Sequence, residues 1–275
     1  MRTIRRPTGL GSIFVHSQFA LVGLLILLPV AWMVASSFKT SAEVTAYPPR
    51  LLFRPTLSNY ARLFGTTPFL EYSRNSTIVA GVSTILGILL AVPAAYAVSW
   101  YRITWPATLT LAARMAPGTL FLLPWYIMFS QLGLVGSHWA LILTHTVITM
   151  PLVLWVMMSF FDAIPREVLE SALIDGCSQA IALTRVALPL VRPGLVVSTI
   201  LAFVFSWNYF LFALVLSGFS SKTLPVAAFN FIGEGATNWG GLMAAATLIA
   251  LPPLILAFCV ERWLVHGLTV GAVKG

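Results

Sequence analysis

Histidine and lysine are the first residue types to test for metal, acid–base or nucleotide chemistry, and neither falls into a catalytic pattern. The four histidines have no metal-ligand spacing with one another or with a carboxylate. A phosphate-binding P-loop needs Gly-Lys followed by Ser or Thr, whereas the three lysines follow Phe38, Ser221 and Val273. No Gly-x-Ser-x-Gly nucleophile elbow occurs. We therefore expect that the chain is not an enzyme and binds no cofactor or metal by itself.

Polar side chains inside apolar stretches are the second group of candidates, because burial in lipid is costly for them. Trp207 and Asn208 could stack on a sugar and hydrogen-bond its hydroxyls, or they could join neighbouring helices. Arg114 could attract an anionic substrate, pair with a carboxylate of another subunit, or reach the edge of the membrane. His145 lies among threonines and could face a polar cavity or hydrogen-bond to an adjacent helix.

Residues 162–193 form the third candidate, a polar segment that holds seven of the 24 charged side chains. Pro165 suits the first turn of a helix, Glu167 can meet the exposed amides there, and Gly176 offers a left-handed stop. This pattern predicts a short amphipathic helix under the membrane, which packs on its own bundle or fills a groove on a partner. Its apolar stripe consists of Val168, Leu169, Ala172 and Leu173.

Stretches of the sequence without charged residues predict the helices that position these residues. Only 9% of the residues are charged, against roughly 25% in a soluble domain, and 59% are hydrophobic. Five uncharged stretches each hold the roughly 20 apolar residues that a helix needs to cross a bilayer, and the longest is divided near Gly133. The chain is thus predicted to be an all-α membrane protein, and soluble, fibrous and disordered classes are excluded. The predicted transmembrane helices are residues 12–37, 75–101, 107–132, 139–161, 194–216 and 239–264.

The basic residues predict the orientation of these six helices. They stand singly at the ends of apolar runs, which indicates a membrane protein and not a nucleic-acid-binding one, despite the net charge of +8. With both termini in the cytoplasm, nine basic residues lie inside and six outside, five of them in one long loop. Seven prolines fall within the spans, a pattern that favours a transporter or channel over a passive anchor.

The polar segment resembles the EAA loop of permease subunits in ATP-binding-cassette (ABC) importers. That loop reads Glu-Ala-Ala, three residues, Gly, nine residues and Ile-x-Leu-Pro, and the same spacing occurs here over twenty residues. Ser171 and Val186 are the two departures, and both are small. The matching residues are Glu170, Ser171, Ala172, Asp175, Gly176, Val186, Leu188 and Pro189.

Three further stretches resemble the maltose-transporter type of sugar permease in particular. Residues 207–214 resemble a Trp-Asn-acidic-Phe-Leu-Phe-Ala-Leu pattern, in which Tyr209 replaces the acidic residue. Residues 223–226 resemble the loop that follows, and residues 267–275 resemble the family's C-terminal ending. The resemblance supports Trp207, Asn208 and Tyr209 as candidates for the substrate path, beside Arg114, which is a candidate from its charge alone.

The resemblance also implies an assembly and a mechanism. Such a chain is a single transmembrane domain over residues 1–275, with the type I ABC importer fold, in the bacterial inner membrane. Its partners are a second homologous permease, two ATPase subunits that bind ATP and Mg, and an extracytoplasmic substrate-binding protein. The segment 162–193 would be the coupling loop, with Glu170 facing a basic group of the ATPase, and the tail with Gly271 and Lys274 would reach toward the ATPase interface.

The function implied is import of a sugar or oligosaccharide by alternating access. Close relatives of this permease type carry glycerol phosphates or their diesters, which makes these the alternative substrates. A membrane scaffold or an intramembrane enzyme, whose polar segment merely packs on itself, is the alternative from a different class.

Overall fold

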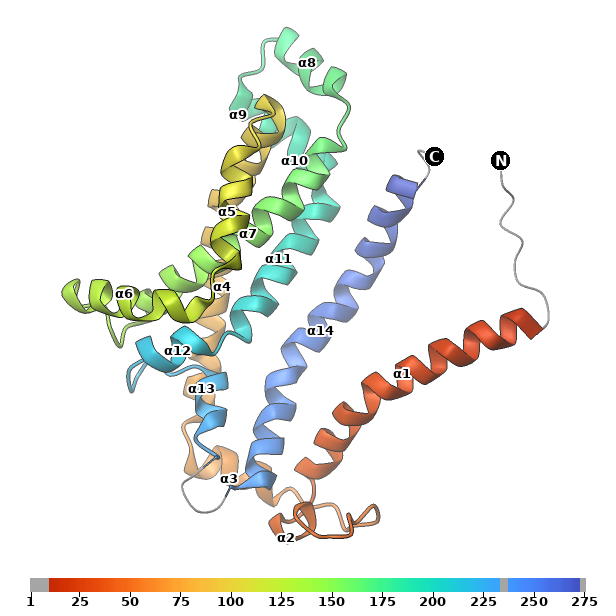
Figure 1. Ribbon diagram of the computed structural model, residues 1–275, viewed down its shortest axis with the longest axis vertical. Coiled ribbons are helices and arrows are strands. Elements are labelled where there is room, and N and C mark those ends of the chain that lie inside the picture. The colour runs from red at the N-terminus through yellow and green to blue at the C-terminus, as the bar shows by residue number, and fades with distance from the viewer. Residues whose placement is uncertain (1–9, 233–236, 273–275) are drawn as a thin grey trace. The chain divides into compact units, whose positions relative to one another are not determined.

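The computed structural model describes residues 10–232 and 237–272, and side chains within residues 12–232 and 237–259 (Figure 1). Over these ranges the regular structure is helical, and one isolated β-bridge joins Gly136 to Ser217. The helices in the first half are α1 (Leu10–Ser37), α2 (Ser41–Val44), α3 (Ser58–Thr66), α4 (Phe69–Tyr101), α5 (Trp105–Met115), α6 (Gly118–Gln131) and α7 (His138–Asp162). Those in the second half are α8 (Arg166–Ile174), α9 (Gln179–Ile181), the π-helical turn η1 (Ala182–Ala187), α10 (Leu188–Leu190), α11 (Arg192–Trp207), α12 (Leu211–Leu216), α13 (Leu224–Phe229) and α14 (Trp239–Ala272).

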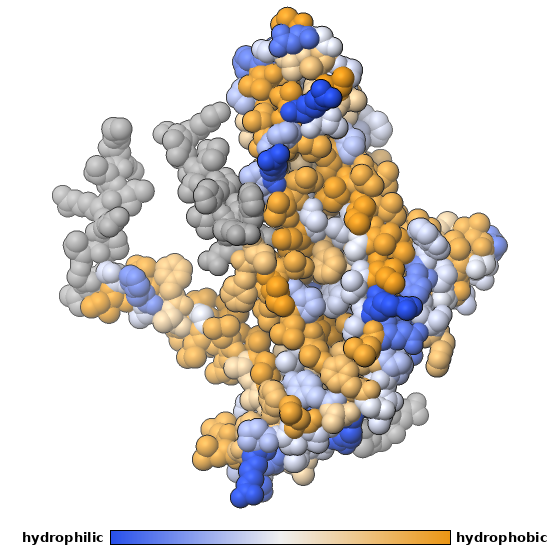
Figure 2. Space-filling view, turned by 180° about the vertical axis from the view of Figure 1, so that it is seen from behind, coloured by the Kyte–Doolittle hydropathy of each residue, from blue (hydrophilic) through white to orange (hydrophobic). Residues whose placement is uncertain are grey.

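Four helices of the described ranges are long and apolar enough to cross a membrane. They include Ser12–Ser37, Phe69–Tyr101, His138–Asp162 and Trp239–Cys259, each close to a predicted span. Apolar side chains cover much of the face drawn in Figure 2, as expected where lipid is the solvent. The protein is therefore a multi-pass membrane protein.

The predicted continuous helix over residues 107–132 is wrong, because two helices, α5 and α6, occupy this stretch. The break lies at Ala116 and Pro117. A proline sterically disfavours the helical conformation of the residue before it, and Ala116 is extended, with φ −66° and ψ 133°. The other six prolines of the predicted spans lie inside helices, so only Pro117 interrupts one.

The predicted helix over residues 194–216 is also interrupted. Helix α11 begins at Arg192 and ends at Trp207, and the short α12 follows after Asn208–Phe210. The Asn208 side chain donates a hydrogen bond to the Val204 carbonyl at 2.8 Å, a local alternative to helical pairing. At its other end, α11 is bent by 85° from the segment Gln179–Leu190. The described structure thus shows four continuous spanning helices, or five if this bent pair crosses the membrane as one.

The chain divides into two compact units, of which the first holds residues up to Thr67 together with residues 228–249. Within it, Lys39 is 1% exposed and donates from Nζ to the Arg50 carbonyl at 2.9 Å. Its ammonium lies 4.2 Å from the ring centroid of Trp32 and 4.9 Å from that of Phe53. Asn59 donates to the carbonyls of residues 37 and 39, which fixes the end of α1 to α3.

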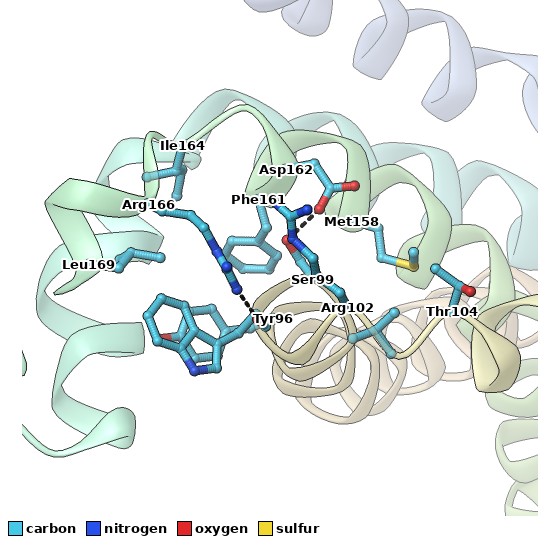
Figure 3. A pocket seen from close by; sticks show the side chains of 12 residues that line it. Tyr96, Ser99, Arg102, Thr104, Met158, Phe161, Asp162, Ile164, Arg166 and Leu169 are labelled. Carbon is cyan, nitrogen blue, oxygen red and sulfur yellow. Dashed lines mark hydrogen bonds between the residues drawn. The ribbon is translucent and has the colours of Figure 1, made fainter.

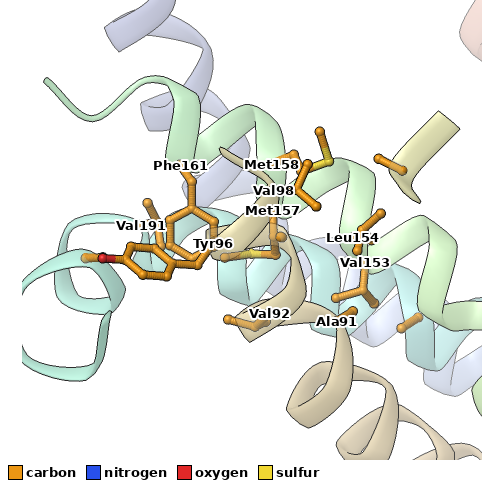
Figure 4. Close-up of a cluster of buried hydrophobic side chains, with 14 of the residues drawn as sticks. Ala91, Val92, Tyr96, Val98, Val153, Leu154, Met157, Met158, Phe161 and Val191 are labelled. Atoms are coloured by element: carbon orange, nitrogen blue, oxygen red, sulfur yellow. The ribbon is translucent and has the colours of Figure 1, made fainter. Parts of the chain in front are cut away.

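The second unit, residues 68–227 with the rest of α14, packs α4, α7 and α11 side by side (Figure 1). Its main apolar cluster lies between these helices and reaches Leu169 of α8 (Figure 4). Small residues allow the close approach: a Cβ on Gly194 would come within 2.4 Å of the Phe160 ring. This three-helix core positions the polar segment at one end and the interrupted helices along its side.

Candidate functional site

Helix α8 begins and ends where its flanking residues require. Pro165 precedes it and Glu167 stands in its first turn, as predicted. Gly176 has φ +87°, and its N–H donates to the Leu173 carbonyl, while the Cys177 N–H donates to the Ala172 carbonyl, both at 3.0 Å. This pair of hydrogen bonds is a Schellman motif, which stops the helix and turns the chain sharply away. The predicted left-handed role of Gly176 is confirmed.

The two sides of α8 differ in what they contact. Leu169 and Ala172 are buried, and Leu169 belongs to the apolar cluster of the second unit, so this part of the predicted stripe packs on its own bundle. Val168 is 40% exposed and Ile174 is 85% exposed, so apolar surface also faces outward. The charged or polar residues that are also exposed here are Arg166, Glu167, Glu170, Ser171 and Asp175. The exposure of Ile174 was not predicted, because it depends on how α8 packs on the bundle.

The segment after α8 returns the chain to the bundle through irregular helix. The π-helical turn η1 leads into α10, where Leu188 packs against the apolar cluster and Pro189 is exposed. Val186 also packs against that cluster. Val186 and Leu188 therefore anchor this segment to the bundle, whereas α8 keeps one side exposed.

A pocket of about 330 Å³ lies between α4, α7 and α8 (Figure 3). Three hydrogen bonds surround it. Tyr96 donates from its hydroxyl to Gln179 Oε1 at 2.9 Å, and Ser99 donates to the Asp162 carboxylate. Arg166 donates from Nη2 to the carbonyl of residue 100 at 2.7 Å, and its guanidinium lies 5.4 Å from the indole centroid of that tryptophan. These contacts were not predicted, because residues 63–83 positions apart in the sequence meet there.

An apolar cavity of about 450 Å³ lies beside both helix interruptions. Arg114 lines it from the last turn of α5, and its guanidinium lies 5.0 Å from the Phe205 ring centroid. Tyr209 lines the same cavity, and a Cβ on Gly118 would lie 3.3 Å from its hydroxyl. The remaining aromatic lining comes from Phe121, Trp125 and Phe212. Among the residues that line this cavity, Arg114 is the one charged side chain, so the wall combines a cation with aromatic rings.

The predicted substrate-path residues separate in the structure. Arg114, Asn208 and Tyr209 line a second, more open cavity of about 650 Å³ that adjoins Phe205. Trp207 instead is 5% exposed and stacks on Phe203, with ring centroids 5.6 Å apart. Trp207 is thus placed in the helix packing, and three of the four predicted residues come together.

Buried polar side chains join the three core helices behind these cavities. His145 Nδ1 lies 2.8 Å from Ser206 Oγ, and Ser206 Oγ lies 2.9 Å from Ser83 Oγ. This row links α7, α11 and α4, which corresponds to the hydrogen-bonding alternative for His145. His145 also meets the Tyr209 ring edge-on, with centroids 5.4 Å apart. The row therefore ends two residues before the interruption at Asn208.

The last predicted site lies beyond the described part of the chain. The backbone of Gly271 belongs to α14, but side chains from residue 260 onward are not described. Lys274 lies outside the described residues.

Comparison with known proteins gives a family match over residues 83–270. The matching family is described as "Binding-protein-dependent transport system inner membrane component". This region includes α8, both helix interruptions and all the cavity-lining residues named above.

Two relatives that match over nearly the whole chain are permease proteins of transport systems. The sulfoquinovosyl glycerol transport system permease protein SmoH of Agrobacterium fabrum is 36% identical, covering 100% of both chains. The trehalose/maltose transport system permease protein MalG of Thermococcus litoralis is 33% identical, covering 93% of this chain and 94% of its own. A chain from the crystal structure of a bacterial ABC transporter for the acidic polysaccharide alginate superimposes with a TM-score of 0.74 at 22% identity, covering 94% and 99% of the two chains. At that identity the likeness concerns the fold.

Proposed function

This chain belongs to the family of binding-protein-dependent transport system inner membrane components, and on that premise we propose that it is the permease subunit of an ATP-driven importer of a sugar or oligosaccharide. The observation that carries the proposal is the family match over residues 83–270, which includes the coupling segment (residues 162–193). Relatives named for trehalose and maltose and for diacetylchitobiose support a saccharide substrate. These names do not favour glycerol phosphates, and the family match argues against a scaffold or an enzyme.

The type I importer permease fold supplies the proposed arrangement in the membrane. The four continuous helices, the bent pair ending in α11 and the interrupted α5–α6 stretch make six crossings of one transmembrane domain, with both termini in the cytoplasm. Interrupted helices are tolerated in a membrane where their free backbone groups line a cavity, and both interruptions border one here. Alternating access would then open this region to one side of the membrane at a time.

We propose that α8 docks in a cleft of an ATPase subunit and is displaced when that subunit moves. The exposed Ile174 and Val168 supply apolar contact, Glu170 offers a carboxylate to a basic group, and Gly176 directs the chain away. Ser171 and Ala172 belong to the same helix and Asp175 is its C-cap, while Leu188 packs against the apolar cluster and the exposed Pro189 follows it in α10. ATP and Mg would be bound by the ATPase subunits, and ATP would act through its different affinity for the two states of the complex. Gly271 and Lys274 of the tail would approach the same interface.

The substrate would pass the cavity beside Arg114, Asn208 and Tyr209. Its aromatic wall suits the apolar faces of a sugar ring, and its polar groups suit hydroxyls. A second, homologous permease would complete the path, and an extracytoplasmic binding protein would deliver the substrate. A solved neighbour of similar fold, with a TM-score of 0.57 at 14% identity, was determined with a periplasmic protein bound to an alginate pentasaccharide.

Co-purification tests the assembly. A tagged chain extracted from its native membrane in mild detergent should bring down an ATPase subunit and a second permease. Isolation of the chain without an ATPase would contradict the proposal and favour the scaffold.

A ligand screen tests the substrate. The binding protein that stimulates ATP hydrolysis by this complex should be stabilised thermally by a saccharide from a panel of maltose, trehalose, chitobiose and a uronic-acid oligosaccharide. Glycerol 3-phosphate belongs in the same panel, and stabilisation by it alone would contradict the saccharide assignment.

A further inference from the structure

The coupling segment is held to α4 by side-chain contacts as well as by its own chain. Three hydrogen bonds connect the last two turns of α4 with residues in and beside α8, and Figure 3 draws the two that involve Ser99 and Arg166. The pairs are Tyr96 with Gln179, Ser99 with Asp162, and the carbonyl of Trp100 with Arg166. The partners are the last residue of α7, the first residue of α8 and the first residue of α9, so the contacts bracket the docking helix.

The α4 residues of these contacts share one face of that helix. Tyr96, Ser99 and Trp100 stand at positions i, i+3 and i+4, which lie one above another on a helix surface. Apolar packing adds to the hydrogen bonds, because the Tyr96 ring meets the Phe161 ring edge-on with centroids 5.5 Å apart. Tyr96 and Leu169 are each 6% exposed within the same cluster. The end of α4 and the base of α8 therefore form one packed body.

The route along the chain from α8 to α11 is mechanically less direct. It passes through the π-helical turn η1 and then through a bend of 85° before α11 begins at Arg192. Helix α4, by contrast, is continuous for 33 residues and packs along both α7 and α11. A displacement of α8 thus has a second path, sideways into α4 through these side-chain contacts, besides the path forward along the chain.

Helix α4 also touches the region of the helix interruption. Its Ser83 hydroxyl bonds to Ser206, two residues before Asn208, which lines the open cavity together with Tyr209. Gly87, one turn further along α4, faces Thr149 of α7, whose Oγ1 would lie 3.3 Å from an added Cβ. A shift of α4 along its axis would therefore displace the residues that line the cavity.

We infer that Tyr96, Ser99 and Arg166 are positioning residues that form a latch between the coupling segment and α4, through which movement of α8 reaches the substrate cavity. This inference rests on the proposed function and adds a mechanical route to it. The latch leaves ATP hydrolysis to the ATPase subunits and determines how much of the movement becomes transport. Loss of the latch should therefore uncouple the two activities.

The test compares uptake with ATP hydrolysis in the purified complex, reconstituted in vesicles with its substrate-loaded binding protein. Tyr96→Phe removes one hydroxyl and keeps the ring that packs on Phe161, and Gln179→Leu removes the acceptor. Each should lower substrate transported per ATP hydrolysed about three- to tenfold, as expected of one lost hydrogen bond. The double variant should be no worse than either single one, because both remove the same contact.

Two further variants complete the design. Tyr101→Phe is the matched control, since Tyr101 ends the same helix and is 60% exposed, and it should keep the wild-type ratio. Ser99→Ala tests a second contact of the latch if a Tyr96 variant assembles poorly, and it should lower the ratio in the same direction.

The outcomes separate the latch from the proposed function. Wild-type transport per ATP in the Tyr96, Gln179 and Ser99 variants would overturn the latch and leave the importer assignment intact. Uptake and hydrolysis that fall together in every variant would also overturn it, because that result indicates a purely structural role. A wild-type chain that assembles with no ATPase would instead overturn the proposed function.

Discussion

The hydroxyl of Tyr209 lies against Gly118, so closely that a Cβ at residue 118 would approach it to 3.3 Å. Tyr209 stands in the interruption between α11 and α12, and Gly118 begins α6 just after the interruption at Pro117. The two interruptions thus meet side chain to backbone at the wall of the 450 Å³ cavity. Their meeting indicates that the cavity depends on both helices being broken at these positions.

Enlarging residue 118 should disturb this contact in steps. Gly118→Val should lower uptake more than Gly118→Ala, because 3.3 Å is tight for one added carbon and prohibitive for three. Adding Tyr209→Phe to Gly118→Ala should restore part of the loss, since it removes the atom that is crowded. Uptake in vesicles and the melting temperature of the complex measure these effects, and a Gly118→Val variant with wild-type uptake would contradict them.

Arg114 provides a prediction about charge in the proposed substrate path. Replacing it with Gln should lower uptake by about ten- to a hundredfold, since a lost charged hydrogen bond to the substrate is worth about 1.5–3 kcal/mol. Arg114→Lys should retain more activity than Arg114→Gln, because it keeps the charge. It should not reach the wild-type rate, because it loses the flat guanidinium over the Phe205 ring. Initial uptake rates across a substrate series give KM and maximal rate for each variant, with exposed Arg54→Gln as the control. Normal transport by Arg114→Gln would remove Arg114 from the path.

The long apolar helices could be predicted from the sequence because each contains a run of roughly 20 apolar residues without a charge. The helix expected over residues 139–161 is observed at His138–Asp162, and the turn expected near Gly133 is present, with φ +66° there. The end of α8 at Gly176 was equally predictable, since its cause is local.

The helix interruptions were harder to predict from the sequence, because residues of the same type, such as proline, also occur inside uninterrupted helices. Pro117 breaks a helix whereas Pro124, seven residues later, lies inside one. The local difference is that Gly118 follows Pro117, and a Pro-Gly pair favours a turn, whereas Trp125 follows Pro124. The contacts of Tyr96 and Gln179, 83 residues apart, arise only when α4, α7 and the coupling segment pack together. Trp207 illustrates the converse, because a residue type suited to sugar binding is used for packing.

Lys39 gives a prediction for the stability of the first unit. Lys39→Met keeps the length of the side chain but loses the hydrogen bond to the Arg50 carbonyl and the contact with the Trp32 ring. We expect a loss of about 1–3 kcal/mol in the free energy of unfolding, the range for a charged hydrogen bond and a cation–π contact. Thermal unfolding measures it, with exposed Arg54→Met as the matched control. An unchanged melting temperature would contradict the role given to the buried ammonium.

Gly176 gives the sharpest test of the coupling helix, because its requirement is purely conformational. Nothing lies within 4 Å of a Cβ built there, so Gly176→Ala adds no clash and only forces an L-residue to φ +87°. That strain costs about 1–2 kcal/mol and favours unwinding of the last turn of α8. Asparagine tolerates this conformation better, so ATPase co-purification and uptake should fall in the order Gly, Asn, Ala.

Gly133→Ala is the matched control for this strain. Gly133 has φ +66° and equally open surroundings, but it lies in the turn before α7, far along the chain from the coupling segment. It should lower the melting temperature as much as Gly176→Ala while the ATPase remains bound. Equal loss of ATPase from both variants would mean that strain anywhere weakens the complex, and the specific role of α8 in docking would then be rejected.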